Sequence, residues 1–418
     1  MVSRDQITTW LPATGHADFR ALWGGTAASS VSLWTLLLGN AYIVYQLSNS
    51  SFWVGVSTFA SMSPYLLAPF GGIIADRAER RLLVRVTRIG AFTTTATLFV
   101  LALTGVIEVW MVVGVALLQG VVRAVEIPAD QSLLANVVPT EDIGNAVALT
   151  SMTQQGSRAV GPLLAGPLLA TIGVEGAYGI AAIFALLAFT SIRRVKTRSR
   201  GGVASLHEVV HSMREGLQYV RHTAPVLAVF LLVVAHCSLT MSFDAMLPGF
   251  AEHELHSPKG GFTWMTLGVG LGALVGTFML AIFTGYRRVR LFFLMGIASG
   301  LSPMIMAASM NLPAAASSAI LMGSSQAMFM ALSAILLQEV IPDAVRGRVM
   351  SLYLMSAGGI MAFANLGFGT LADRWGAPVL FLIPGGLFVV IVVASTITGP
   401  HLRRLYRTGQ MPATVPAS

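Results

Sequence analysis

The sequence predicts an all-α membrane protein with twelve transmembrane helices, arranged as two pseudo-symmetric halves of six. Composition is the first reason: hydrophobic residues make up 55% of the chain and charged residues 11%, whereas soluble domains carry about 25% charged residues. The apolar residues also come in runs of about 20, the length at which a helix crosses about 30 Å of hydrocarbon. The third reason is an internal repeat, in which residues of one half recur in the other at a constant offset.

The apolar runs divide the chain into regularly spaced spans. A transmembrane β-barrel would instead show weak alternation in segments of about ten residues. The polar N-terminus is followed by a long first run without a cleavage site, which does not resemble a signal peptide. We place the spans at 21–46, 52–75, 83–104, 109–138, 143–172, 176–193, 224–249, 262–284, 290–310, 313–339, 348–372 and 377–399.

The basic residues indicate how these spans are oriented. With the N-terminus inside, 22 of the 26 Lys and Arg residues fall in the N-terminus, the even-numbered connections and the C-terminus. Lys259 and Arg374 fall outside, and Arg123 and Arg158 lie within spans. This bias follows the positive-inside rule and places both termini in the cytoplasm. The net charge of +8 is thus spread between alternate spans, which argues against nucleic-acid binding and favours a multi-pass protein of the cytoplasmic membrane.

Glycines and turn residues recur with a constant offset. Gly120 falls on Gly323, and the stretch NVVPTEDIGNAVAL matches EVIPDAVRGRVMSL in hydrophobic phase and turn chemistry. A parallel repeat of two six-helix units is a known transporter plan, with the binding site near the membrane midplane between the repeats. We therefore assign residues 1–193 to an N-terminal half and 224–418 to a C-terminal half with a cytoplasmic tail.

The connection between the halves is the segment 194–223. It begins basic, with two consecutive glycines, and becomes amphipathic from Ser205 onwards. This pattern predicts a surface helix on the cytoplasmic side, and a regulatory or partner site is the alternative. The apolar residues at helical spacing are Leu206, Val209, Val210, Met213, Leu217 and Val220.

The stretch GGIIADRAERR, residues 71–81, ends the second span. It resembles the signature of the major facilitator superfamily in the loop between spans 2 and 3, which implies a transporter that works by alternating access. The resemblance implies a cytoplasmic latch whose partner is the start of span 11, near Gly347 and Arg348. A glycine permits close helix packing, an acid can face the positive end of another helix, and a plain positive-inside stop signal would need no acid. The latch residues in this sequence are Gly72, Asp76, Arg77, Arg80 and Arg81.

Within the superfamily, several stretches resemble the branch of enterobactin-exporter-like proteins and related drug exporters. They include FRALW at 19–23, YQLSNSSFWVGV at 45–56, EGLQYVR at 215–221 and RGRVMSLY at 346–353. Many relatives carry a Gly-Asp pair in span 1, where this chain has SSVSLWTLL at 29–37. A coupling role for that acid therefore does not carry over.

The stretch GSRAVGPLLAGP in span 5 resembles a motif of proton-coupled antiporters. The residues concerned are Gly156, Gly161, Pro162 and Gly166, which would form a kinked, close-packed helix face. The resemblance implies antiport. Helix packing without antiport is the alternative, because Gly-Pro segments are common in membrane helices.

Span 4 carries ionisable residues inside the bilayer, where they are costly and therefore candidates for function. Gln119, Arg123, Glu126 and Asp130 follow at i, i+4, i+7 and i+11, so they share one face of a helix. Arg158 of span 5 lies at a depth similar to that of Arg123 when residues are counted from the turn between the spans. We therefore expect a cluster of Arg123, Glu126 and Arg158, with Asp130 below it.

The roles within this cluster are open. Two guanidinium groups would hold Glu126 ionised and make it a poor proton carrier until substrate or a conformational change separates them. Asp130 is predicted to be less surrounded. We expect Arg123 and Arg158 to meet anionic groups of the substrate or Glu126 in turn, while Glu126 or Asp130 carries the proton. The alternative is a structural salt-bridge network.

Further candidates lie in other spans. In span 7, His236 and Asp244 lie roughly along one face with Thr240. Histidine changes charge near neutral pH, but placement in the core is equally expected. Asn40 in span 1 and Asn365 in span 11 are weaker candidates.

The repeat predicts a different chemistry in the C-terminal half. Gln326 replaces Arg123, and Phe329 replaces Glu126, so this half offers neutral contacts. The many Met and Phe residues would suit an adaptable apolar pocket, although packing and lipid contact are the default.

The chain carries no GxxxxGK[ST] loop for ATP and no catalytic or paired-cysteine pattern, so we expect neither an enzyme nor a bound cofactor or metal. The expected function is proton-coupled export of an amphipathic small molecule, such as a siderophore or a drug, by a monomer in the lipid bilayer. The alternatives are a facilitator or importer of a small nutrient, and a membrane sensor or scaffold that keeps the fold without transport.

Overall fold

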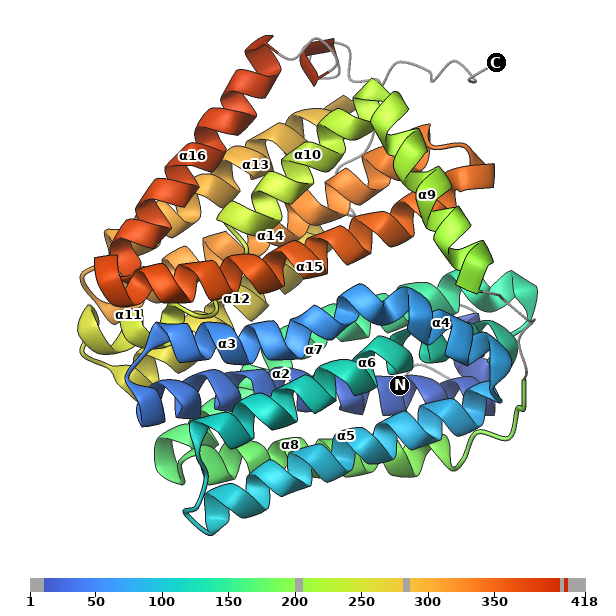
Figure 1. Cartoon of the computed structure of the whole chain (residues 1–418), viewed down its shortest axis with the longest axis horizontal. Helices are drawn as coiled ribbons and strands as arrows, with labels where there is room; N and C mark the ends of the chain where they lie inside the picture. The colour runs from blue at the N-terminus through green and yellow to red at the C-terminus, as the bar shows by residue number, and fades with distance from the viewer. Residues whose placement is uncertain (1–10, 200–205, 281–285, 399–401, 405–418) are drawn as a thin grey trace, which may run out of the picture. The chain divides into compact units, whose positions relative to one another are not determined.

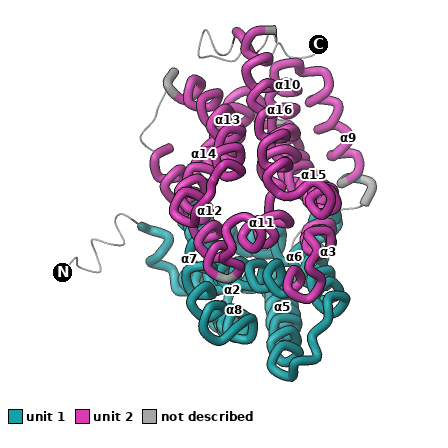
Figure 2. Tube along the Cα trace, turned by 90° about the vertical axis from the view of Figure 1, so that its left-hand side faces the viewer, with its two compact units in different colours: residues 1–43, 64–209 teal, residues 44–63, 210–418 magenta. Residues whose placement is uncertain are grey.

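The computed structural model describes residues 11–199, 206–280, 286–398 and 402–404. Every secondary-structure element in these ranges is a helix (Figure 1), which confirms the predicted all-α class. Many of these helices are apolar on all sides, as expected of helices that face lipid as well as each other. The chain divides into two compact units: unit 1 comprises Met1–Ile43 and Pro64–Val209, and unit 2 comprises Val44–Ser63 and Val210–Ser418 (Figure 2).

Unit 1 contains most of α2 and five further long helices. Glycines and small residues let these helices approach closely: a Cβ on Gly161 of α7 would lie 2.6 Å from the Cβ of Trp34 in α2. A short 3-10 turn, Thr140–Asp142, joins α6 to α7, and Gly173, at φ 107°, begins α8. The helices are α2 (Ala17–Ser48), α4 (Ala68–Arg77), α5 (Arg80–Leu103), α6 (Val109–Val137), α7 (Ile143–Thr171) and α8 (Val174–Ile192).

Unit 2 contains α3, taken from the first half of the sequence, and the helices that follow the linker. Asn311 starts α14 by accepting the backbone N–H of Ala314 at 3.0 Å. A Cβ on Gly323 of α14 would lie 1.9 Å from the carbonyl oxygen of Val269 in α12, so glycine is required where these helices cross. The helices are α3 (Ser51–Met62), α9 (Leu206–His222), α10 (Ala224–Leu239), α11 (Leu247–His253), α12 (Pro258–Leu280), α13 (Tyr286–Ala307), α14 (Leu312–Val340), α15 (Asp343–Trp375) and α16 (Ala377–Thr398).

Among the described residues, nine helices are long and apolar enough to cross a membrane, and α9 with α10 would form a tenth as a bent pair. This is consistent with the twelve predicted spans. Two predicted spans are not continuous helices. The second divides into α3 and α4 around the 3-10 turn Ser63–Leu67, which contains Pro64. The seventh ends as α10 at Leu239, and α11 begins only at Leu247.

The linker forms the predicted helix, α9, from Leu206 onwards. The last part of α9, Val210–His222, makes an angle of 103° with α10. Val220 is buried, and a Cβ on Gly216 would lie 3.2 Å from Arg348 in α15. One face of α9 is therefore packed against the start of α15.

Candidate functional site

Unit 1 buries an ionic cluster in which one arginine lies between two acids. The side chain of Arg88 in α5 is fully buried, and its Nη2 lies 3.2 Å from each carboxylate oxygen of Asp130 in α6. Its Nε lies 3.8 Å from Oε1 of Glu126, also in α6. Because a buried charge is costly unless it is paired and hydrogen-bonded, this arrangement lets a single guanidinium compensate two carboxylates.

Helix α2 closes the cluster with hydroxyl groups. Thr26 accepts a hydrogen bond from Nη2 of Arg88 at 3.0 Å and donates to Oδ2 of Asp130 at 3.1 Å. Ser29 donates to Oε1 of Glu126 at 3.1 Å. The five side chains therefore bind α2, α5 and α6 to one another.

Arg123 provides a second cation one helical turn from Glu126. Its Nη1 lies 3.6 Å from Oε2 of Glu126, and its Nη2 donates to the carbonyl oxygen of Ser29 at 3.1 Å. Within the described part of the chain, Oε2 of Glu126 accepts no hydrogen bond and Nε of Arg88 donates none. Glu126 is therefore held less tightly than Asp130.

A small cavity lies against this cluster. It has about 30 Å³ of room for water, and a water molecule needs about 10–15 Å³ measured in this way. The cavity can therefore hold one or two waters, whereas a drug-sized ligand needs several hundred cubic ångströms. Its polar lining residues are Ser29, Ser32, Arg88, Thr95, Gln119 and Arg123.

The structure brings together Arg123, Glu126 and Asp130 of the predicted span-4 and span-5 cluster. Arg123, Glu126 and Asp130 share one side of α6, as the helical spacing predicts. Arg158 of α7 lies with its guanidinium 5.0 Å from the centre of the Trp34 ring, a cation–π geometry. Besides Arg123, Arg88 of α5 also lies beside Glu126.

Sequence reasoning missed Arg88 because it was counted among the cytoplasmic basic residues. Helix α5 begins at Arg80, so Arg88 lies eight residues, or about 12 Å, along the helix. Basic residues that mark the cytoplasmic side lie at the ends of spans. The depth of Arg88 within the apolar run was the signal that could have identified it.

The neutral polar candidates of unit 1 have local partners. Asn40 accepts a hydrogen bond from the hydroxyl of Tyr178 at 2.8 Å, and both side chains are buried. Gln119 lies within 3.4 Å of the hydroxyl of Thr94 and also borders the small cavity. Asn40 thus serves to join α2 to α8, while Gln119 belongs to the surroundings of the ionic cluster.

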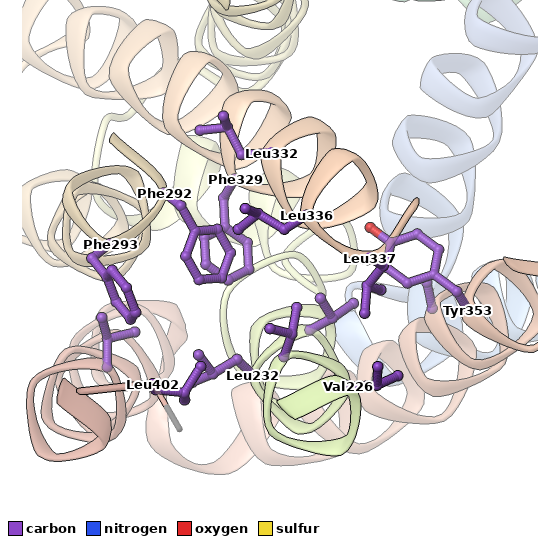
Figure 3. Close-up of a cluster of buried hydrophobic side chains, with 14 of the residues drawn as sticks. Val226, Leu232, Phe292, Phe293, Phe329, Leu332, Leu336, Leu337, Tyr353 and Leu402 are labelled. Atoms are coloured by element: carbon purple, nitrogen blue, oxygen red, sulfur yellow. The ribbon is translucent and has the colours of Figure 1, made fainter. Parts of the chain in front are cut away.

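In unit 2 the corresponding position is aromatic. Phe329 of α14, the repeat counterpart of Glu126, stacks on Phe292 of α13 with ring centres 4.7 Å apart (Figure 3). His236 of α10 lies 4.5 Å from the Phe329 ring, and its Nδ1 is within 2.7 Å of the Thr240 hydroxyl. The position that corresponds to Glu126 is therefore occupied by aromatic packing, and neutral substrate contacts in this half stay a prediction.

The remaining candidates of unit 2 lie beside this aromatic cluster. Gln326 is buried and donates to the carbonyl oxygen of Thr240 at 2.7 Å. Asp244 lies half-buried in the turn between α10 and α11. Asn365 is buried and accepts the backbone N–H of Ala245 at 3.3 Å, which ties that turn to α15. Among the described residues, no group of three or more His, Cys, Asp or Glu side chains could hold a metal ion.

The sequence matches the family described as transmembrane secretion effector over residues 7–409. The chain belongs to this family. It is therefore a multi-pass membrane transporter of the major facilitator superfamily, which confirms the resemblance read from the GGIIADR stretch.

Relatives of this chain include named exporters. Macrolide efflux protein A from Streptococcus pyogenes is 23% identical over 387 residues, which cover 90% of this chain and 94% of that protein. Enterobactin exporter EntS from Shigella boydii serotype 18 is 23% identical over 263 residues, covering 62% and 63%. A POT family transporter solved in complex with 5-aminolevulinic acid has a TM-score of 0.75 at 12% identity, over 93% of this chain and 97% of that one. That likeness shows the fold alone.

The glycine of the GGIIADR stretch that contacts a neighbouring helix is Gly71. A Cβ on Gly71 would lie 2.2 Å from the carbonyl oxygen of Ala124 in α6, whereas a Cβ on Gly72 would meet nothing within 4 Å. The close-packing role predicted for Gly72 in the latch stays a prediction. The side chain of Asp76 lies outside what the structure describes.

The basic residues of the same stretch lie at the end of α4 and the start of α5. Arg80 donates from Nη1 to Oδ1 of Asn136 at 2.7 Å, near the end of α6. Arg77 is exposed and Arg81 is half-buried. Arg80 thus fixes the start of α5 against α6 within unit 1.

The predicted partner region of the latch is the start of α15. Arg348 forms an ion pair of 2.6 Å with Glu215 of α9, and a Cβ on Gly347 would have open space around it. Arg348 therefore joins the linker helix to α15. The latch between Asp76 and this region stays a prediction.

The antiporter-like motif lies in the middle of α7. Gly161 packs against Trp34 and Thr35 of α2, and Thr35 donates to its carbonyl oxygen at 3.3 Å. Gly156 is half-buried and Gly166 is buried. The helix continues through Pro162. The structure shows close packing at Gly161, and antiport stays a prediction.

Proposed function

We propose that this transporter exports an amphipathic small molecule from the cytoplasm in exchange for protons. It acts as a monomer in the cytoplasmic membrane, with both termini inside, and its halves 1–193 and 224–418 alternate about a midplane site. Two relatives support the direction of transport, since one is named for macrolide efflux and another for enterobactin export.

The observation that carries the coupling to protons is the position of Arg88 between two carboxylates. If a proton binds to Glu126, Arg88 remains paired with Asp130 at 3.2 Å. If it binds to Asp130, Arg88 still faces Glu126 at 3.8 Å. A buried site that accepts and releases a proton without leaving a bare guanidinium avoids the main cost of changing charge inside a membrane.

Glu126 is the better proton carrier of the two. Asp130 accepts hydrogen bonds from Arg88 on both oxygens and a third from Thr26. Oε2 of Glu126 accepts none within the described residues, although Arg123 lies 3.6 Å away. The side chain of Asp130 is 15% exposed and that of Glu126 is 1% exposed. In this proposal a proton enters past Asp130 and rests on Glu126, one of the two carriers that the sequence left open.

Protonation of Glu126 would loosen the contacts between helices. The carboxylate holds Ser29 of α2 and attracts Arg88 of α5, and a neutral carboxyl group attracts both less strongly. Arg123 would also lose its partner and become available to an anionic group of the substrate. In the simplest antiport that this geometry supports, a proton binds Glu126 and an anionic group of the substrate takes the place of Glu126 beside Arg123.

Transport into inside-out vesicles tests the proposal. Wild type, Glu126→Gln and Asp130→Asn would be compared with Glu141→Gln, which neutralises an exposed acid of unit 1. The probes are a macrolide, a catecholate siderophore and a cationic dye, each with and without an imposed proton gradient. We expect gradient-driven accumulation of at least one probe, lost in Glu126→Gln and kept in Glu141→Gln. Accumulation in wild type that ignores the gradient would instead indicate a facilitator.

A further inference from the structure

The carboxylate of Asp373, at the end of α15, caps the start of α3. Its Oδ1 accepts the backbone N–H of Ser51 at 2.6 Å, and its Oδ2 accepts that of Phe52 at 3.2 Å and the hydroxyl of Ser50. Ser50, which occupies the N-cap position, makes no cap hydrogen bond with its own side chain. The first N–H groups of a helix lack partners within it, so an acid more than three hundred residues away in the sequence supplies them here.

Two glycines bring α3 and α15 into backbone contact next to this cap. A Cβ on Gly369 would lie 2.4 Å from the carbonyl oxygen of Ser51. A Cβ on Gly55 would lie 2.8 Å from the carbonyl oxygen of Asn365 and 3.2 Å from the Cα of Leu366. The surfaces of the two helices are thus complementary along about one and a half turns of α3, from Ser51 to Gly55.

A second polar contact lies close to the cap. The hydroxyl of Tyr45, near the end of α2, is 3.0 Å from Nε2 of His253 in α11. A cavity with about 440 Å³ of room for water borders both contacts, with Tyr45, Ser51, His253 and Asp373 among its lining residues. Asp373 is itself exposed. Water can therefore replace either contact when it breaks, so these contacts can open without leaving buried polar groups unsatisfied.

The sequence around Asp373 repeats the stretch read as the cytoplasmic latch. Residues 369–374 are GTLADR and residues 72–77 are GIIADR, so both read G-x-x-A-D-R. Their separation of 297 residues (369 − 72) differs from the 203-residue offset of the internal repeat (323 − 120). The second copy is therefore not a product of that repeat. Under the predicted topology it lies at the outer end of span 11, whereas the first lies at the inner end of span 2.

We propose that Asp373 is the latch of an outer gate, which holds the transporter closed to the outside by capping α3. Because α3 is the first part of predicted span 2, one G-x-x-A-D-R stretch ends that span and the other caps its start. Opening to the outside separates α3 from α15 and exposes the N–H groups of Ser51 and Phe52 to water. The proposal rests on the alternating access of the proposed function and adds the residue that stabilises one of its two states.

Distances between spin labels on α3 and α15 test this gate in the full chain in lipid nanodiscs. The labels replace Trp53 and Trp375, which are 39% and 58% exposed, in a Cys237→Ser background that removes the single, buried cysteine. We expect wild type to show mainly the short distance. Asp373→Ala should lower the ratio of closed to open molecules by about tenfold, which corresponds to about 1.4 kcal/mol, within the range known for loss of an N-cap.

Two further variants separate capping from other effects. Asp373→Asn should give a closed population between those of wild type and Asp373→Ala, because the amide keeps one of the two acceptor oxygens and replaces the other by a donor. Thr370→Ala, which changes an exposed residue of α15 whose hydroxyl binds only its own helix among the described contacts, should match wild type. Equal distance distributions in wild type and Asp373→Ala would overturn the latch.

The distance measurement needs neither substrate nor a proton gradient. If the gate opens in Asp373→Ala but vesicles show no gradient-driven transport, the latch proposal is supported and the proton-coupling proposal is rejected. Transport that depends on Glu126, with unchanged distances in Asp373→Ala, would reject the latch alone.

Discussion

Nη2 of Arg88 lies 3.2 Å from each of the two carboxylate oxygens of Asp130, in a part of unit 1 where the arginine side chain has no exposed surface. This contact links α5 to α6 and leaves Nε to face Glu126, while Nη1 donates to the carbonyl oxygen of Ala188 at 3.3 Å. The stability of unit 1 and the proposed proton exchange therefore depend on the same arginine.

Replacing Arg88 by methionine should strongly destabilise the protein. The change leaves Asp130 and Glu126 without their shared counter-charge, and breaking a buried ion pair in this way costs about 3–5 kcal/mol. Thermal unfolding in detergent micelles would measure the loss. Arg85→Met is the matched control, because Arg85 is exposed on the same helix and its loss should change stability by less than about 0.5 kcal/mol. Equal stability of the two variants would contradict the burial seen at Arg88.

The neighbouring glycines of the GGIIADR stretch should respond in opposite ways to alanine. Gly71→Ala places a methyl group 2.2 Å from the carbonyl oxygen of Ala124, and such overpacking costs about 1–3 kcal/mol. Gly72→Ala meets open space and should stabilise α4 by about 0.5–1 kcal/mol, since alanine favours helix. Unfolding midpoints of the two variants would show whether they fall on opposite sides of wild type. A larger loss of stability in Gly72→Ala than in Gly71→Ala would indicate that Gly72 packs closely, as the sequence predicts.

The ion pair between Glu215 and Arg348 should contribute little to stability. Both side chains are more than a third exposed, and exposed pairs are worth about 0–1 kcal/mol. Arg348→Ala should therefore leave the unfolding midpoint almost unchanged while limited proteolysis cuts the linker faster. The double exchange Glu215→Arg with Arg348→Glu should recover the slower cleavage. Cleavage as slow in Arg348→Ala as in wild type would show that the packing of Gly216 alone holds α9.

Removing the ring of Phe329 should destabilise unit 2. Phe329 is fully buried and stacks on Phe292, and truncating a buried Phe to Ala costs about 3–5 kcal/mol. Phe278→Ala is the control, because that side chain is 72% exposed and its loss leaves no cavity in the protein. Guanidinium-induced unfolding in mixed micelles would compare the two. A small effect at Phe329 would show that the aromatic cluster relaxes around the space.

The sequence allowed the helical class and most of the helix positions to be predicted, because the bilayer imposes a length and an apolar composition on each span. It did not reveal the break between α3 and α4. Pro64 lies inside an apolar run, and proline is tolerated in membrane helices when neighbouring groups satisfy the backbone. Hydrophobic length alone therefore cannot tell a broken span from a continuous one.

The sequence allowed the part of the site that lies on a single helix, α6, to be predicted. The spacing of Arg123, Glu126 and Asp130 fixes their directions on α6, and the structure places them on one side. Which residue of a neighbouring helix meets them depends on packing, and Arg158 was chosen by depth alone. Arg88, on α5, was hidden by the assumption that basic residues near the end of a span mark the cytoplasm.

The aromatic stack in unit 2 bears on which half of the transporter binds the proton. If the two halves of the transporter carried the same buried charges, both would respond to protons in the same way. Here the buried formal charges seen in the described residues, Arg88 and Glu126, belong to unit 1, while the corresponding place in unit 2 holds Phe292 and Phe329. In the proposed exchange the proton therefore binds in unit 1, while the corresponding place in unit 2 holds two aromatic rings that bind no proton.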